Sequence, residues 1–354
     1  MSAVGKTPII SMAGVPAFTG LDAASIQNGG AWLEGQLEKL RPELYKPLNN
    51  VNYPRDIPFE MGGGFAEYVS SNFVTYADSS ANQWGIIEGS TNVVGTIAAN
   101  RTKDVWRNYL WAKCLRIPFV DQEKWSMVGQ SLQSTLQDGL QISWDKMIEQ
   151  NAYLGFSDYG TYGLVNNPNV TASLAPASAQ SGTPRNWCNA TTGAPTTKTT
   201  AEILADINNV IYATQVASEY DIEGIADRII LPPIQFNYIS TTMAILNGIP
   251  LAITIKEFLE RNNVAALNGK ELKIVSDRHC IGVGLPLTSG GAKTNRMVAY
   301  SKNKKFVRLD ILQPLTKVFT QPVAEQIGWL TPYIGNVSQV QFLAYQPVAY
   351  LDGI

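Results

Sequence analysis

One stretch of the sequence, Asp121 to Tyr153, constrains the fold more than any other. Apolar residues recur in it at the spacing of one helix face, and they are Trp125, Val128, Leu132, Leu136, Leu140, Trp144, Met147 and Ile148. Asp121 can cap the amino end of such a helix, and Gly155 can adopt the left-handed conformation that ends one. At about 1.5 Å per residue the helix would be about 50 Å long. The sequence therefore predicts one long amphipathic helix, which belongs either to a globular core or to an extended subunit.

Composition excludes several classes of protein. The 354 residues are 45% hydrophobic and only 16% charged, with a formal net charge of −2, whereas a soluble domain is usually about 25% charged. No apolar run reaches the roughly 18 residues of a membrane span, so we expect neutral polar residues to cover the surface, as in proteins that neighbours enclose. The amino terminus lacks a basic segment followed by an apolar one, which predicts no secretion signal and a location in the cytoplasm of the producing cell.

The residues before the long helix predict an arm and a hairpin. Residues 1–61 are rich in proline and contain one short helical stretch, Gly30 to Leu40, so they form an arm on a neighbouring surface or, alternatively, a disordered tail. Residues 62–100 contain two strand-like runs, Phe65 to Tyr76 and Trp84 to Ala98, around a turn-forming stretch. A two-stranded hairpin is marginally stable alone, and we expect it to need a partner in the same or another molecule.

The residues after the long helix predict a compact α/β lobe and a closing β segment. A surface loop at 171–200 leads to a helix that begins near Thr200, a suitable N-cap, and ends near Val216. Two further helical pieces are predicted at Asn237 to Leu246 and Ile255 to Asn262. Strands are predicted at Asp227 to Leu231, Leu272 to Val275, Met297 to Ser301, Val307 to Leu312, Val318 to Thr320, Val340 to Tyr345 and Pro347 to Leu351.

No group of residues predicts catalysis, cofactor binding or metal binding. The single histidine, His279, precedes Cys280, but adjacent residues of a strand face opposite ways. We therefore favour a structural histidine over a nucleophile system. The other cysteines, Cys114 and Cys188, are far from Cys280 in sequence, so we expect neither disulfides nor a zinc site.

Two stretches have the composition of phosphate-binding sequences. The glycine-rich segment from Gly282 to Thr294 fails the P-loop spacing because Leu287 stands where the first glycine belongs, and we favour a flexible loop. A basic run of Lys302, Lys304 and Lys305 could contact phosphates. With a net charge of −2, the run is more typical of a solvated turn.

The order of elements resembles that of the Hong Kong 97-type major capsid proteins of tailed bacteriophages. The likeness covers most of the chain from about Gly62 onward, whereas residues 1–60 match only as an arm. The most specific piece is the segment after the long helix, Gly163 to Val170. The other residues that carry the resemblance are Val120 to Lys124, Gly129 to Leu132, Asp145 to Gly155, Ile229 to Pro233 and Tyr345 to Ile354.

The resemblance implies an α+β, Hong Kong 97-like capsid fold with four parts. These are an N-terminal arm at 1–61, an extended β-hairpin loop at 62–100, a peripheral domain at 101–215 and 302–354 that includes a long spine helix at 121–153, and an axial domain at 216–301. The apolar face of the spine helix would pack against the sheet of the peripheral domain and not against a ligand.

The resemblance also implies a function. The chain would be a major capsid protein that self-assembles as hexamers and pentamers into an icosahedral head enclosing double-stranded DNA, without catalytic residues or cofactors. Its partners would be other copies, a portal protein, a scaffolding protein or protease, optionally a decoration protein, and the packaged DNA by non-specific contact, with no membrane. It would be found in the virion, and in the host cytoplasm during assembly. Two alternatives stay open: an encapsulin-type nanocompartment with the same fold, and an α/β enzyme.

Overall fold

The computed structural model describes residues 50–78, 96–127, 131–180, 185–246, 248–288, 290–324 and 327–354, all within the unit Asn49–Ile354. The predicted helix at Gly30 to Leu40 and most of the predicted strand at Trp84 to Ala98 lie outside these residues. The described helices are α2 (Tyr53–Asp56), α3 (Phe119–Met127), α4 (Leu132–Tyr153), α5 (Thr200–Ala217), α6 (Pro233–Thr241), α7 (Ile255–Arg261) and α8 (Val264–Leu267), with 3-10 turns η1 (Ser157–Tyr159), η2 (Ile222–Gly224) and η3 (Arg278–Cys280).

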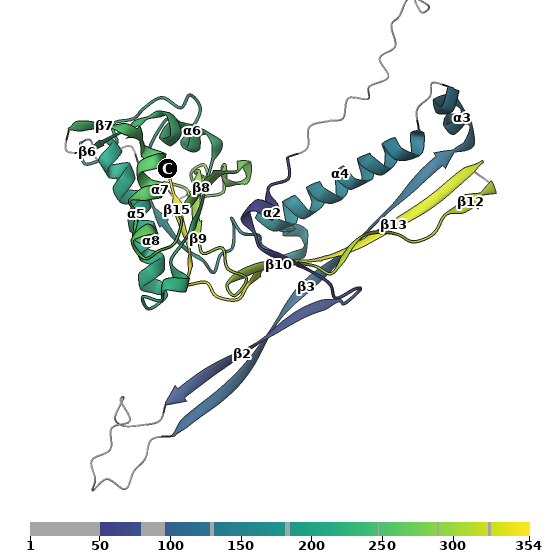
Figure 1. Ribbon diagram of the computed structural model, residues 1–354, viewed down its shortest axis with the longest axis horizontal. Coiled ribbons are helices and arrows are strands. Elements are labelled where there is room, and N and C mark those ends of the chain that lie inside the picture. Colours follow the sequence, from purple (N-terminus) through teal and green to yellow (C-terminus); the bar gives the residue numbers. More distant parts are fainter. Residues whose placement is uncertain are drawn as a thin grey trace, which may run out of the picture. The chain divides into compact units, whose positions relative to one another are not determined.

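The described strands form several sheets, so the predicted α+β class is confirmed (Figure 1). Strand β10 pairs with β1 and β14, β6 pairs with β7, and the two larger sheets have the orders β11-β13-β3-β2, with β12 also on β13, and β4-β15-β9-β5-β8. The strands are β1 (Phe59–Met61), β2 (Tyr68–Asp78), β3 (Ile97–Pro118), β4 (Thr171–Leu174), β5 (Arg228–Leu231), β6 (Met243–Leu246), β7 (Ile249–Thr254), β8 (Lys273–Ser276), β9 (Arg296–Tyr300), β10 (Val307–Ile311), β11 (Gln313–Lys317), β12 (Gln321–Val323), β13 (Gly328–Ser338), β14 (Gln341–Phe342) and β15 (Val348–Asp352).

The sheet β4-β15-β9-β5-β8 separates two hydrophobic cores. Successive side chains of a strand point to opposite faces, and the cores follow this rule. Ile229 and Met297 lie in a core with residues of α5, α6 and α7, whereas Ile230 and Val298 lie in a core with residues of α4 and β10. The central strands β15, β9 and β5 are therefore buried on both faces. Strand β15 and helix α5, which the sequence assigns to the peripheral domain, share these cores with β5 and β9, which it assigns to the axial domain. The domain boundaries stay a prediction.

The predicted elements of the lobe need two corrections. The cap of α5 is Thr199 and not Thr200, because the Thr199 hydroxyl accepts the Glu202 N–H group while the Glu202 carboxylate accepts the Thr199 N–H group. The helix predicted to continue to Leu246 ends at Thr241, and the residues after it form β6. Gly248, with a φ of 79°, turns the chain so that β6 can pair with β7.

The prediction of one uninterrupted helix from Asp121 to Tyr153 is wrong, because the structure contains two helices there. Helix α3 ends at Met127 and α4 begins at Leu132. Between them, Ser131 has an extended backbone, and its hydroxyl accepts the Ser134 N–H group as a helix cap. Asp121 lies in the first turn of α3 and is not its cap.

The predicted packing of α4 is confirmed. Leu140 contacts side chains of β3 and β13, and Trp144 lies 5.3 Å from Trp111 of β3, measured between ring centroids. The Trp144 ring occupies the space that a side chain at Gly335 of β13 would fill. As predicted, the residue after the helix cap is Gly155, with a φ of 68°. The apolar face of α4 therefore packs on the sheet that contains β3 and β13.

The second strand of the hairpin is longer and later than predicted. Strand β3 has 22 residues, Ile97–Pro118, and includes the stretch from Arg101 to Ile117 that no strand prediction covered. Its first half pairs with β2 and its second half pairs with β13. Residues 79–95, between β2 and β3, lie outside the described residues.

The closing segment is partly as predicted. Strands β10 and β15 are confirmed, but Val318 to Thr320 lies between β11 and β12, and the strand predicted at Val340 to Tyr345 is limited to Gln341–Phe342. Strand β13 was missed because Pro332 and two glycines are unfavourable strand residues. Pairing with β3 along its full length overrides that preference.

The end of the predicted arm is part of the folded unit. Pro54 lies in the first turn of the short helix α2, where an N–H group would have no partner within the helix. Phe59–Met61 then pairs in parallel with β10. Residues 50–61 are thus fixed to the body, whereas the arm before them lies outside the described residues.

Candidate interaction surfaces

The ribbon formed by β2 and the first half of β3 has no third strand in the described part of the chain. The strands pair in continuous register from Tyr68 opposite Arg107 to Asp78 opposite Ile97. Strand β2 has β3 as its sole neighbour in the described sheets. Two paired strands are marginally stable alone in water, and no described strand pairs with the outer edge of β2. This ribbon is therefore suited to contact another molecule.

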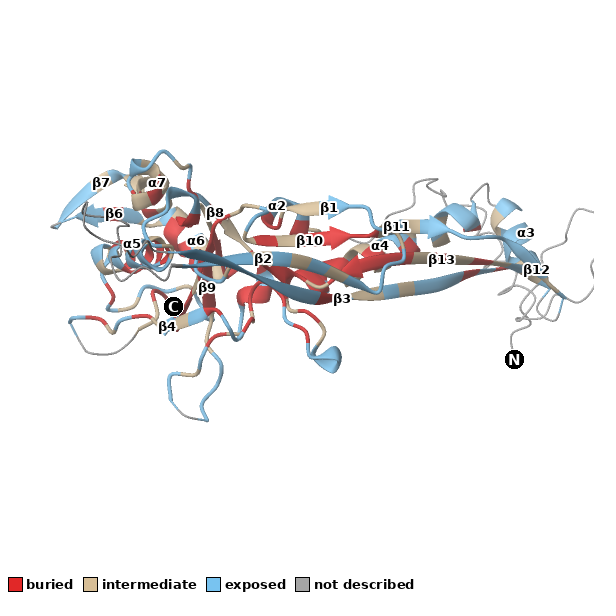
Figure 2. Ribbon diagram, turned by 90° about the horizontal axis from the view of Figure 1, so that it is seen from below, coloured by how far each residue is buried: buried red, intermediate tan, exposed pale blue. Residues whose placement is uncertain are grey.

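One face of the ribbon is partly buried and the other is exposed. Side chains paired across an antiparallel ladder lie on the same face. Trp106 is only 8% exposed and lies edge-on to Phe73 of the same face. The opposite face carries exposed apolar side chains, Tyr68, Val74, Tyr76 and Val105, and Figure 2 shows most of the ribbon as exposed. Apolar groups gathered in this way mark an interaction surface.

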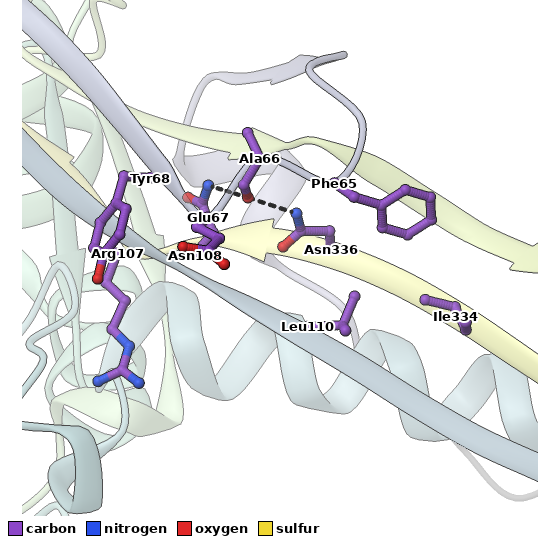
Figure 3. Close-up of a pocket in the computed structure, with 9 residues that line it drawn as sticks. All are labelled: Phe65, Ala66, Glu67, Tyr68, Arg107, Asn108, Leu110, Ile334 and Asn336. Atoms are coloured by element: carbon purple, nitrogen blue, oxygen red, sulfur yellow. Dashed lines mark hydrogen bonds between the residues drawn. The ribbon is translucent and has the colours of Figure 1, made fainter.

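A cavity of about 560 Å³ lies at the base of the ribbon (Figure 3). The side-chain amides of Asn108 and Asn336 donate to the Ala66 carbonyl at 2.8 and 3.0 Å, which fastens the segment before β2 to β3 and β13. Their Oδ1 atoms are buried without a hydrogen-bond partner among the described groups. Phe65 and Leu110 line the cavity and are 63% and 66% exposed. The base of the ribbon is therefore fixed, and it presents to the outside a hollow lined by both apolar and polar side chains.

Two further groups of exposed apolar side chains lie on other elements. Met243 and Ile249 are exposed on the β6–β7 hairpin. A second group lies on α3 and around β12 and β13: Phe119, Val120, Met127, Phe319, Ile327 and Trp329. Together with the ribbon, these groups give the unit apolar surface in three regions of the chain.

The segment that follows α4 is fixed to the end of that helix. The backbone N–H groups of Leu164 and Val165 donate to carbonyls of the last helical turn at 2.9 and 3.0 Å. Asn166 accepts the Gly163 N–H group at 2.8 Å and donates to the Leu154 carbonyl at 2.7 Å. The residues most specific for the sequence resemblance therefore satisfy carbonyls that a helix end leaves free.

Three side chains of metal-binding type meet in the interior, where the sequence predicted no such set. Potential ligand atoms of Glu149, Asp277 and His279 lie within 4.8 Å of one another. Each already contacts protein groups. Glu149 accepts the N–H groups of Asn52 and Tyr53, both at 3.0 Å, and Asp277 accepts the Asn52 side chain at 2.9 Å and lies 2.7 Å from His279 Nδ1. The cluster fastens the start of α2 to α4, and the absence of a metal site stays a prediction.

Burial and hydrogen bonding shift the pKa values of Glu149 and Asp277 in opposite directions. Burial raises the pKa of Glu149, although the backbone N–H donors lower it in part. Burial also acts to raise the pKa of Asp277, but hydrogen bonds from His279 and Asn52 outweigh it and hold that pKa below its usual range. His279 in addition stacks on Tyr153, with 4.9 Å between ring centroids. These contacts hold His279 in place within the interior, and its structural role stays a prediction.

We expect Glu149→Leu to destabilise the unit by about 2–4 kcal/mol, since it leaves the buried N–H group of Tyr53 and the partly buried one of Asn52 without an acceptor. Glu149→Gln keeps an acceptor oxygen in the same place and should cost less than about 1 kcal/mol. Urea titration of both variants measures the difference. Equal losses for the two variants would show that the acceptor is not what holds the segment.

The remaining residues considered from the sequence are held by protein contacts. Cys280 is fully buried, which raises the pKa of its thiol, and all three cysteines are free. Gly284 and Thr294 form an isolated bridge within the glycine-rich segment. The basic run forms a turn whose side chains bind nearby groups. Lys302 donates a hydrogen bond to the Arg55 carbonyl. Lys304 forms an ion pair with the Glu60 carboxylate, and Lys305 forms one with the Glu223 carboxylate.

One comparison with known proteins identifies a family, and another identifies solved structures of similar fold. Residues 82–354 match the family model described as major capsid protein. Among solved structures, the chain is similar to the capsid of Myoviridae phage XM1, with a TM-score of 0.69, 16% identity, and 90% of this chain and 98% of that one covered. The capsid of cyanophage P-SCSP1u gives a TM-score of 0.57 at 14% identity, with 89% and 92% covered.

A third structure, the capsid of an empty GTA particle, gives a TM-score of 0.59 at 10% identity, with 94% of this chain and 99% of that one covered. These similarities show a shared fold, as the sequence resemblance implied. A comparison with curated proteins finds no match. Among the described residues, no helix has the length and apolar character that crossing a membrane requires.

Proposed function

This chain belongs to the major capsid protein family, and from that premise we propose that it self-assembles as hexamers and pentamers into an icosahedral head that encloses double-stranded DNA. The observation that carries the proposal is the β2–β3 ribbon, which exposes apolar side chains and has no third strand within the described unit. Neighbouring copies would supply the missing contacts. The family match favours a capsid over a nanocompartment or an α/β enzyme.

Each of the four predicted parts of the chain would have its own role in assembly. The extended loop (62–100) and the N-terminal arm (1–61) reach neighbouring copies, apart from residues 50–61, which are fixed to the body of their own copy. The peripheral domain (101–215 and 302–354) and the axial domain (216–301) form the body of each copy and make the contacts around each ring. Exposed apolar residues of the β6–β7 hairpin, Met243 and Ile249, are suited to contacts within such a ring.

The role is structural, and we propose that the protein has no enzymatic activity. Its further partners would be a portal protein, a scaffolding protein or protease during assembly, optionally a decoration protein, and the packaged DNA through non-specific contacts. The finished protein would reside in the virion, after assembly in the host cytoplasm.

The contents of native particles test the function. We expect particles purified from producing cells to contain this chain as the major protein and to protect double-stranded DNA from added nuclease. Extraction and gel analysis of the protected nucleic acid, beside the protein composition, provide the measurement. Particles that hold an enzyme cargo and no protected DNA would instead identify a nanocompartment.

A further inference from the structure

Basic residues are concentrated in strand β3. The whole chain has 27 basic and 29 acidic residues, but Ile97–Pro118 contains five basic side chains and one acidic one. The remainder therefore has 22 basic and 28 acidic residues. A strand with a net charge of +4 thus belongs to a chain whose other residues sum to −6.

The register of the ribbon places three of the cations on one face. Arg101, Lys103 and Arg107 alternate along β3, so their side chains share a face, and Asp104 lies on the other. Opposite these cations, β2 presents Val74, Asn72 and Tyr68 in the same order. All three cations are exposed. We name this surface, formed by Arg101, Lys103, Arg107 and their partners on β2, the basic face of the ribbon.

The cations of the basic face are only partly engaged within the unit. Arg107 lies over the Tyr159 ring, with 5.3 Å from its Cζ atom to the ring centroid. Neither Arg101 nor Lys103 has an ion pair among the described residues. By contrast, several exposed acidic groups of the body, such as Glu123 and Asp158, carry charge of the opposite sign.

We propose that the basic face of the ribbon docks on an acidic surface of a second copy of this chain, through ion pairs made by Arg101 and Lys103. This inference rests on the proposed function and specifies the chemistry of one of its contacts. Two observations favour a second copy over DNA. The rest of the chain carries the complementary charge, and exposed apolar side chains, Val74, Tyr76 and Val105, lie on the same face. A protein surface buries them, whereas a row of phosphates does not.

A matched pair of double variants tests the proposal. Arg101→Gln with Lys103→Gln removes two charges from the basic face, and Asn100→Glu with Thr102→Glu changes the net charge equally at neighbouring exposed positions on the other face. We expect the first variant to raise the protein concentration needed for half assembly about tenfold, and the second to change it less than about twofold. Circular dichroism of both variants before assembly checks that the ribbon change leaves the fold intact.

Chemical cross-linking tests the contact directly. A carbodiimide joins a lysine amine to a carboxylate that touches it, so particles assembled from mixed ¹⁴N- and ¹⁵N-labelled wild-type protein should yield a peptide that links Lys103 of one label to an Asp or Glu of the other. Particles that assemble but give only same-label links, or an Arg101/Lys103 variant that assembles as well as wild type, overturn the proposal.

The remaining outcomes are also decisive. If the Arg101/Lys103 variant assembles normally but particles retain less DNA, the basic face serves the genome and the proposal is wrong. If wild-type protein forms no particles under any condition, the proposed function itself fails, and this inference fails with it.

Discussion

Arg296→Met is expected to lower the free energy of unfolding by about 3–5 kcal/mol, because it leaves a buried carboxylate without its cation. Arg296 of β9 donates two hydrogen bonds to Asp352 of β15, at 2.7 and 2.8 Å, and a third to the Val165 carbonyl at 2.8 Å. The Asp352 side chain is 0% exposed. Removing the guanidinium therefore weakens the five-stranded sheet and its contact with the segment after α4. Urea titration of unassembled protein, followed by tryptophan fluorescence, measures the change.

Arg261→Met is the matched control. Arg261 lies 2.8 Å from Glu257, but both side chains are largely exposed, at 69% and 45%, and surface ion pairs contribute little. We expect its unfolding midpoint to stay close to that of the wild type. Similar midpoints for the Arg261 and Arg296 variants would contradict the assignment of stability to the buried pair.

Gly163→Ala is expected to cost about 3 kcal/mol, since the added methyl group meets backbone that cannot easily move. A Cβ atom at Gly163 would lie 2.2 Å from the Tyr153 carbonyl carbon and 2.5 Å from the Leu154 nitrogen. To avoid this clash the turn must separate from the end of α4, which breaks the hydrogen bonds of Leu164 and Val165 to the helix. The same urea titration measures the loss.

Gly139→Ala is the control, because we expect it to raise the free energy of unfolding instead of lowering it. Gly139 lies within α4, and a Cβ atom there would have no neighbour within 4 Å. Alanine favours the helix over glycine by about 1 kcal/mol, so this variant should be more stable than the wild type. A Gly163 variant as stable as the Gly139 variant would show that the close approach of turn and helix does not matter.

Local patterns predicted much of the fold. The apolar spacing in Leu132–Tyr153 placed α4, and Gly155 placed its end, because both signals depend on residues close in sequence. The short strands predicted at Asp227 to Leu231 and Leu272 to Val275 likewise correspond to β5 and β8 within one residue at each end. The capsid-type fold followed from a resemblance whose most specific residues, Gly163 to Val170, prove to be those that bind the end of α4.

The features that the sequence did not predict depend mostly on contacts between residues far apart in the chain. Strand β3 extends to Pro118 because β13 pairs with its second half, although the aromatic and β-branched residues from Val105 to Trp111 were a local signal for a strand. The cluster of Glu149, Asp277 and His279 was missed because 128 positions separate Glu149 from Asp277 in the sequence, and only the fold joins them. The apolar spacing continues across Ser131 and so did not reveal that this residue has an extended backbone and caps a separate helix.

Electron microscopy of the purified wild-type protein tests most directly the central claim that this chain self-assembles into closed shells. Across a range of protein concentrations and ionic strengths, we predict closed shells, or rings of five and six copies that convert into shells. Monodisperse monomers under every condition, with neither rings nor shells, would contradict the account.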